Sequence, residues 1–345
     1  MLLRVAKPSK LWYSSCMKKI NLKFILLPLV ILALFFIFLK GYCSDRPDPA
    51  AKKSKRLTNP LLQYVKFKEL PLFRPEVEEL IKKEKEKGAV TRVAVYFRDL
   101  SDGMWFGISE REKFTPASLL KIPIMMSYFK LAEKDPGILN KKIKYETPKS
   151  QLFSPGIKEK SSAEEGKYYT VDELVRFMIV ESDNKASLLL LENLPKGELK
   201  RTFANFRINP GTGSFEGDFV SLKICASFLR ILYNASYLNE ELSEKALRYL
   251  EECSYRDGIA AAGLPKDIIV AHKFGERFSE ETGERQLHEI AIVYYPESPY
   301  ILAVMTSGKD YAQLARVIKD ISELVYKNVD ASYKAVDDGS FVFSE

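Results

Sequence analysis

The chain has 345 residues, of which 46% are hydrophobic and 29% are charged, and its formal net charge is +7. This composition is ordinary for a globular protein and excludes a wholly disordered or low-complexity chain. The positive excess lies largely in residues 1–23, which contain no acid, so the charge does not indicate a nucleic-acid-binding surface on the folded part. With two histidines and no Cys-x-x-Cys pair, no metal site is expected.

Residues 24–42 form a nearly continuous apolar run after the basic segment 1–23. The run just reaches the roughly 20 apolar residues that a membrane-spanning helix requires. We therefore expect a transmembrane anchor at 24–42, and the alternative is the apolar core of a signal peptide. A basic flank stays on the cytoplasmic side, so the rest of the chain is expected outside. Residues 43–60, which are rich in proline, alanine and lysine, are expected to form a linker.

The spacing of apolar residues predicts the secondary structure of the remaining chain. A charged amphipathic helix is expected at 74–87, followed by strands at 90–98 and 104–109 that Asp102-Gly103 joins as a hairpin. A long apolar helix is expected at 117–132. Further helices are expected at 171–179, 185–192, 221–233 and 240–252, then strands at 268–274, 288–295 and 300–306, and a last helix at 311–327.

The order of these elements is two strands, a block of helices, three strands and a helix. Two strands alone are only marginally stable, so strands far apart in the sequence are expected to pair. This predicts an α/β fold of the α+β type, in which a mostly antiparallel sheet is flanked by helices and carries an inserted all-helical subdomain. The predicted domain spans 61–329, and residues 330–345 are expected to form a C-terminal tail.

Ser118 and Lys121 lie at the start of the long apolar helix that the sequence predicts. Residues three apart on a helix share a face, so the lysine amine would lie near the serine hydroxyl. Serine needs a base beside it to act as a nucleophile, and a lysine can be that base when burial or a second cation lowers its pKa. Pro116 marks the helix start, where the helix dipole favours an oxyanion. Because Ser127 and Lys130 have the same spacing, the spacing alone is weak evidence.

The tripeptide Ser182-Asp183-Asn184 follows the predicted helix 171–179. A serine hydroxyl at this place could pass a proton to a leaving amine, and an asparagine amide could hold a substrate carbonyl. The alternative is a capping turn, because serine, aspartate and asparagine all favour helix N-termini.

The tripeptide Lys273-Phe274-Gly275 lies on the predicted strand 268–274. A lysine beside a substrate site supplies a fixed positive charge for a carboxylate, and a glycine lets the backbone approach a ligand closely. The alternative is an ordinary strand end with a bulge.

The three segments occur in a fixed order, with about 60 residues from Ser118 to Ser182 and about 90 from Ser182 to Lys273. In order and spacing they resemble the class A β-lactamases and penicillin-binding proteins, whose motifs are Ser-x-x-Lys, Ser-Asp-Asn and Lys-Thr-Gly. The resemblance covers about 61–329. It implies a penicillin-recognising serine hydrolase with no metal or organic cofactor.

By this resemblance, Ser118 would be the acylated nucleophile and Lys121 would be its base. Ser182 would relay the proton, and Asn184 would position the substrate. Lys273 would hold a substrate carboxylate and assist Ser182 electrostatically.

The third motif supplies the other half of the implied site. The backbone N–H groups of Ser118 and Glu276 would form the oxyanion hole, beside Phe274 and Gly275 in the substrate-binding region. The sequence departs from the family here, because the middle position of this motif usually carries a hydroxyl and Phe274 cannot donate a hydrogen bond. Lys273 would then bind a carboxylate alone or with another donor.

A second departure concerns hydrolysis of the acyl-enzyme. Class A β-lactamases carry a glutamate in an Ω-loop that directs the hydrolytic water, usually as Glu-x-x-Leu-Asn. Residues 207–218 are shorter and lack that context, and Glu216 is the candidate base. The alternative for Glu216 is a solvated loop acid. Deacylation requires an activated water, so a slowly released acyl-enzyme is expected.

The resemblance implies a β-lactam or a peptidoglycan-derived amide as substrate. With the anchor at 24–42, it implies a single-pass protein of the bacterial cell membrane with its catalytic domain outside the cytoplasm. A competing hypothesis is a non-catalytic module on the same fold that binds wall peptide or a protein. The complete set of motif residues favours the enzyme, whereas Phe274 and the missing Ω-loop glutamate favour the binding module.

Overall fold

The computed structural model describes residues 73–148, 161–209, 217–261, 264–265 and 267–337. Their centre is a five-stranded sheet in the order β2-β1-β9-β8-β7, in which every neighbouring pair is antiparallel. The strands are β1 (Arg92–Asp99), β2 (Trp105–Ile108), β7 (Val270–Phe278), β8 (Arg285–Val293) and β9 (Tyr300–Gly308). The first two strands thus pair with the last three, as the sequence predicts.

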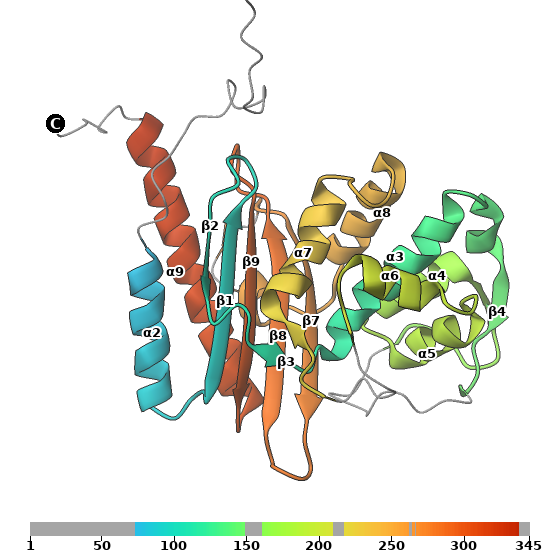
Figure 1. Cartoon of the computed structure of the whole chain (residues 1–345), viewed down its shortest axis with the longest axis horizontal. Helices are drawn as coiled ribbons and strands as arrows, with labels where there is room; N and C mark the ends of the chain where they lie inside the picture. The colour runs from blue at the N-terminus through green and yellow to red at the C-terminus, as the bar shows by residue number, and fades with distance from the viewer. Residues whose placement is uncertain (1–72, 149–160, 210–216, 262–263, 266, 338–345) are drawn as a thin grey trace, which may run out of the picture. The chain divides into compact units, whose positions relative to one another are not determined.

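The alternation of side chains along the central strands divides the interior into two cores. On β1, Val93, Val95 and Phe97 point into one core, while Ala94 and Tyr96 point into the other. Helices α2 (Arg74–Glu86) and α9 (Tyr311–Asp337) cover the first face, and the other helices lie on the opposite side (Figure 1). Burial on both faces explains the continuous apolar runs 93–97 in β1 and 300–305 in β9.

A helical lobe occupies the sequence between β2 and β7. Its helices are α3 (Lys121–Ala132), α4 (Val171–Val180), α5 (Asn184–Asn193), α6 (Glu198–Asn205), α7 (Leu222–Tyr233) and α8 (Glu240–Glu251). Smaller elements join them: β3 (Lys113–Phe114) with β6 (Val220–Ser221), β4 (Lys142–Lys144) with β5 (Tyr168–Thr170), and the 3-10 turns η2 (Ala117–Leu120), η3 (Pro136–Asn140) and η4 (Gly258–Ala261). The predicted fold class, an antiparallel sheet flanked by helices with an inserted helical subdomain, is confirmed.

Several predicted boundaries differ from the structure, and three of these differences bear on the description below. The apolar segment 117–132 does not form one helix, because its first turn is the 3-10 turn η2. Strand β7 continues past the predicted end at residue 274 to Phe278, since pairing with β8 persists over that length. Helix α9 extends to Asp337, into the segment 330–345 that was expected to be a tail.

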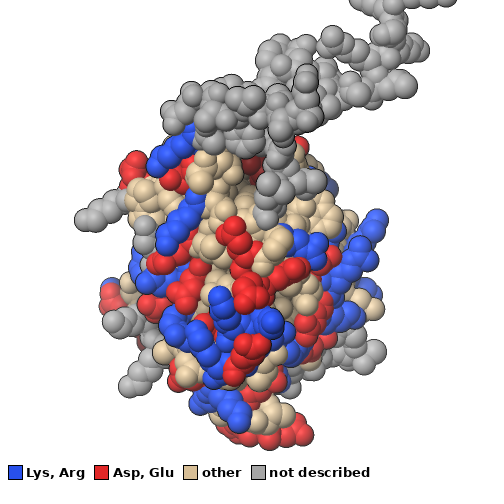
Figure 2. All heavy atoms as spheres, turned by 90° about the vertical axis from the view of Figure 1, so that its left-hand side faces the viewer, with Lys and Arg blue, Asp and Glu red and all other residues tan. Residues whose placement is uncertain are grey.

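The surface formed by α2 and α9 carries acidic and basic side chains intermixed (Figure 2). A groove of about 620 Å³ runs between the two helices. It is lined by Pro75, Glu76, Glu79, Leu80, Lys83, Asp320, Glu323, Leu324 and Lys327. This groove lies on the face of the sheet opposite the helical lobe.

Within the described ranges, no helix has both the length and the apolar character needed to cross a bilayer. The predicted anchor 24–42 and the linker 43–60 lie outside those ranges.

Candidate active site

Ser118 lies in the 3-10 turn that precedes α3. The Lys121 backbone N–H is directed to the Ser118 carbonyl oxygen, which closes one 3-10 turn between the two residues. Side chains three apart eclipse one another in a 3-10 turn, so Ser118 and Lys121 project on the same side. Ser118 is half-buried, whereas Lys121 is fully buried. The nucleophile candidate is thus accessible and its base candidate is shielded from water.

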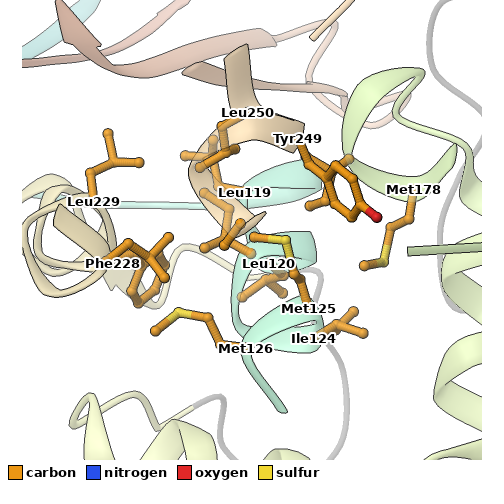
Figure 3. Close-up of a cluster of buried hydrophobic side chains, with 14 of the residues drawn as sticks. Leu119, Leu120, Ile124, Met125, Met126, Met178, Phe228, Leu229, Tyr249 and Leu250 are labelled. Carbon is orange, nitrogen blue, oxygen red and sulfur yellow. The ribbon is translucent and has the colours of Figure 1, made fainter. Parts of the chain in front are cut away.

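Apolar packing holds this turn in place (Figure 3). Leu119 and Leu120, which lie between Ser118 and Lys121 in the chain, are at most 2% exposed. They pack among side chains of α3, α4, α7 and α8, including Met125, Met178, Phe228, Leu229 and Leu250. Burying each leucine stabilises the fold by about 1.5–3 kcal/mol, so the turn is anchored by its own neighbours.

Two non-glycine residues at the site have left-handed backbone conformations. Ala117, directly before Ser118, has φ of 48°, and Ser182 has φ of 57°. Such conformations cost an L-residue of order 1–3 kcal/mol and occur most often at functional sites. The left-handed Ala117 opens the 3-10 turn η2, which precedes α3.

The Lys121 amine lies at the junction of α3 with the turn between α4 and α5. Its Nζ atom donates to the Ser182 carbonyl oxygen, lies 3.1 Å from Ser182 Oγ and lies 2.7 Å from Asn184 Oδ1. The second predicted motif is therefore in direct contact with the first. Carbonyl and amide oxygens replace the water that this buried amine has lost.

Lys273 reaches the same hydroxyl from β7. Its Nζ atom is 2.8 Å from Ser182 Oγ, and its side chain is fully buried. The structure thus brings all three predicted motifs to one point, although Ser118, Ser182 and Lys273 lie on different elements.

Asp183 fixes the turn that carries Ser182. It is the N-cap of α5, and its Oδ1 atom accepts from the Ala186 N–H at 2.9 Å. Its Oδ2 atom accepts from the hydroxyls of Tyr145 at 2.7 Å and Ser161 at 2.5 Å. The capping interpretation of this tripeptide is therefore correct for Asp183, while Ser182 and Asn184 face Lys121. Tyr145 and Ser161 had no signal in the sequence, because both lie in loop segments far from the motif.

Gly275 allows β7 to approach the Ser118 turn. A Cβ atom added at Gly275 would lie 3.0 Å from the Pro116 carbonyl oxygen and 3.2 Å from the Ser118 nitrogen. Contacts this short are rare for real side chains, so glycine is the residue that this approach requires. The backbone of Ser118 and that of the third motif are thus direct neighbours.

The described geometry can be compared with known proteins. A sequence model described as "Beta-lactamase enzyme family" matches residues 73–329, well over half of the chain. The chain belongs to the beta-lactamase enzyme family. A curated "Beta-lactamase" of Phocaeicola vulgatus is 25% identical over 179 residues, which is 46% of this chain and 55% of that protein. The chain therefore matches only about half the length of that relative.

Solved structures give the same fold. The structure of PBP-A superposes with a TM-score of 0.63 at 18% identity, over 75% of this chain and 97% of that one. A class A beta-lactamase from Mycobacterium abscessus superposes with a TM-score of 0.62 at 23% identity, over 73% and 98%. At these identities the likeness establishes the fold.

Phe274 sets this member of the beta-lactamase enzyme family apart at the third motif. Its ring stacks on Tyr255, with centroids 4.2 Å apart and an interplanar angle of 17°. The Lys273 Nζ atom lies 4.3 Å from the centroid of the Phe274 ring. Both aromatic residues are half-buried. Tyr255 was not predicted, because nothing in the sequence links a residue after α8 to a motif on β7.

A buried charged pair lies on the far side of the same strand. His272 Nδ1 is 2.8 Å from Glu289 Oε1, and both side chains are fully buried. Burial alone would lower the pKa of His272, but hydrogen bonds with Cys253 and Glu289 raise it to about 9. Glu289 also accepts from the Ile259 N–H at 2.7 Å. The pair therefore ties β7, β8 and η4 together next to Lys273.

Glu216 and Glu276 are the remaining residues of the predicted site. Glu216, the candidate deacylation base, lies outside the described residues. Glu276 follows Gly275 on β7 and is half-buried, so its backbone is next to the turn that contains Ser118. The roles of these residues stay predictions.

Proposed function

We propose that this chain is a serine hydrolase that forms an acyl-enzyme on Ser118 with a β-lactam or a cell-wall-peptide-like amide. The observation that carries the proposal is the convergence of Lys121 and Lys273 on the Ser182 hydroxyl, beside a half-buried Ser118. A base, a proton relay and a nucleophile are the groups that acyl transfer to serine needs.

The acylation step follows from these contacts. An uncharged Lys121 amine can donate its two N–H groups to the carbonyl oxygens of Ser182 and Asn184, which leaves its lone pair to accept the Ser118 proton. Burial and the nearby Lys273 ammonium both favour that uncharged form. Ser118 Oγ then bonds to the substrate carbonyl carbon, and the backbone N–H groups of Ser118 and Glu276 stabilise the oxyanion.

Collapse of the tetrahedral intermediate breaks the carbonyl carbon–nitrogen bond. The leaving nitrogen takes a proton from the Ser182 hydroxyl, and Ser182 is reprotonated by Lys121. Lys273, donating to Ser182 Oγ, stabilises negative charge that develops there during the transfer. Asn184 holds Lys121 through Oδ1, and its amide group would also donate to a substrate carbonyl.

The acyl-enzyme is proposed to be released slowly. Acylation needs Ser118, Lys121 and the oxyanion hole, whereas hydrolysis needs an activated water. The segment 207–218 has no Glu-x-x-Leu-Asn, and Glu216 is the single candidate that the sequence offers for this task. We therefore expect covalent capture of β-lactams with little steady turnover. Rapid steady hydrolysis of a chromogenic cephalosporin would contradict this part of the proposal.

Labelling by a fluorescent penicillin tests the proposal. The full chain should form a covalent fluorescent adduct, and the Ser118→Ala variant should not. Ser127→Ala is the matched control, because Ser127 has the same spacing to a lysine on α3 but donates to the Pro123 carbonyl oxygen and contacts Thr202. It should label like the wild type.

The proposed location is the bacterial cell membrane. The support is the basic segment 1–23 followed by the apolar run 24–42. Peptidoglycan-derived substrates lie outside the cytoplasm, which agrees with a catalytic domain on that side.

The alternative is a non-catalytic binding module on the same fold, and the aromatic Phe274 at a position that usually carries a hydroxyl favours it. Such a module would bind the fluorescent penicillin reversibly or not at all. Labelling that survives denaturation and depends on Ser118 excludes it.

A further inference from the structure

The third motif ends in an aromatic pair rather than in a hydroxyl donor. Phe274 and Tyr255 stack face to face at 4.2 Å, and both remain partly exposed. The Lys273 ammonium lies over the Phe274 ring at 4.3 Å and donates to Ser182 Oγ at 2.8 Å. The Lys273 ammonium thus contacts both the Phe274 ring and the Ser182 hydroxyl.

A carboxylate that approached this end of the site would lose water without gaining a hydroxyl partner at residue 274. Desolvating an anion without a compensating hydrogen bond is costly, and a phenylalanine ring offers no donor. A stacked aromatic pair instead gives a flat surface on which uncharged groups pack well.

Acidic side chains also lie near the pair. Glu276 shares a strand face with Phe274 by alternation on β7, and Glu289 is directly opposite Phe274 on β8. Burial raises the pKa of the Tyr255 phenol, and the carboxylates of Glu289, Asp257 and Glu276 raise it further. The aromatic pair therefore lies beside acids, of which Glu289 is paired with His272.

We propose that Phe274 and Tyr255 are specificity-determining residues that select substrates with an uncharged group, rather than a carboxylate, at this end of the site. The inference rests on acylation of Ser118 as proposed above. It assigns the substrate to the class of uncharged amides or esters.

A matched pair of probes tests this: benzylpenicillin, which carries a carboxylate, and its methyl ester, which does not. In both, Ser118 Oγ bonds to the lactam carbonyl carbon, the lactam C–N bond breaks, and the hydroxyl proton ends on the nitrogen. The whole probe mass is therefore added, and intact-protein mass measured over time gives both acylation rates. The wild type should react with the methyl ester at least about tenfold faster, because the carboxylate of benzylpenicillin loses water beside Phe274 without gaining a hydrogen bond there.

Two variants of nearly equal size separate the effect of the hydroxyl from that of the ring. Phe274→Thr restores a donor and should raise the rate with benzylpenicillin about tenfold relative to Phe274→Val, which has the same shape without the donor. The methyl ester should not distinguish the two variants.

Each outcome bears on a different claim. If the wild type reacts faster with benzylpenicillin, the specificity inference is wrong while acylation of Ser118 stands, and Lys273 or Arg277 would be the group holding the anion. If neither probe adds to Ser118 in the wild type or in Phe274→Thr, the proposed function itself is wrong, and the specificity inference fails with it.

Discussion

Lys121 on α3 and Lys273 on β7 contact the same atom, Ser182 Oγ, at 3.1 Å and 2.8 Å. A hydroxyl oxygen has two lone pairs, so once Lys121 has taken up the Ser118 proton, Ser182 Oγ can accept from both ammonium groups and still direct its own proton toward a third group. The two lysines, fully buried, thus position one proton donor between the helical lobe and the sheet. This relationship explains why three motifs separated in sequence have to meet for the site to work.

Replacing Lys121 tests its role as the base. The Lys121→Met variant keeps the size of the side chain but has no basic nitrogen, and the rate of Ser118 acylation should fall by about 10²–10⁴. Lys121→Arg should be equally slow, because a guanidinium cannot give up its proton. Time-resolved intact mass with benzylpenicillin methyl ester measures these rates. If Lys121→Arg kept the wild-type rate, Lys121 would supply charge and not act as a base.

Asp183 should support both stability and acylation. In Asp183→Ala the α5 cap is lost and the hydroxyls of Tyr145 and Ser161 lose their acceptor, so the free energy of unfolding should fall by about 3 kcal/mol. Asp135→Ala is the matched control, because Asp135 caps η3 through Gly137 N–H on the surface. It should cost about 0.5–1 kcal/mol. Urea unfolding measures both, and equal losses would contradict the role given to the buried cap.

The Gly275→Ala variant tests the close approach of β7 to the Ser118 turn. The added methyl group would press on the Pro116 carbonyl oxygen and the Ser118 nitrogen, which should displace the oxyanion donor and slow acylation at least tenfold. Gly217→Ala, where a Cβ atom meets nothing within 4 Å, should acylate at the wild-type rate. Equal rates for the two variants would show that this approach does not matter for catalysis.

His288 should make the fold sensitive to acid. Burial lowers its pKa to about 4, against 6.5 for a free histidine, and its ring donates to the Thr115 carbonyl oxygen at 3.0 Å. Between pH 6.5 and 4 the unfolded chain binds a proton here that the folded chain does not. Stability from this residue is therefore present above pH 6.5 and is lost as the pH falls toward 4, by about 3 kcal/mol.

A comparison of the wild type with His288→Gln isolates this contribution from that of the carboxylates. The unfolding free energy of the wild type minus that of His288→Gln should fall as the pH is lowered from 6.5 to 4, because only the wild type loses this contribution. A difference that stays constant over this range would contradict the assignment to His288.

Much of the fold follows from local patterns in the sequence. The Asp102-Gly103 hairpin, the apolar helices and the late strands were predictable because the spacing of apolar residues and the choice of turn residues determine local structure. The resemblance in motif order also led us to expect the three motifs close together, and Lys121, Ser182 and Lys273 are in contact.

The remaining features depend on tertiary contacts. The 3-10 turn at 117–120 begins at Ala117, whose left-handed backbone no local pattern in the sequence predicts. Likewise, the stacking of Tyr255 on Phe274 and the hydrogen bond from Tyr145 to Asp183 join residues from separate elements.

The most direct test of the central claim is mass mapping of the protein after reaction with a β-lactam. The full chain is incubated with benzylpenicillin methyl ester, digested, and searched for the modified peptide. The account predicts one adduct, on Ser118, with the full mass of the probe and absent from Ser118→Ala. An adduct on another residue, or no adduct with either this probe or benzylpenicillin, would contradict it.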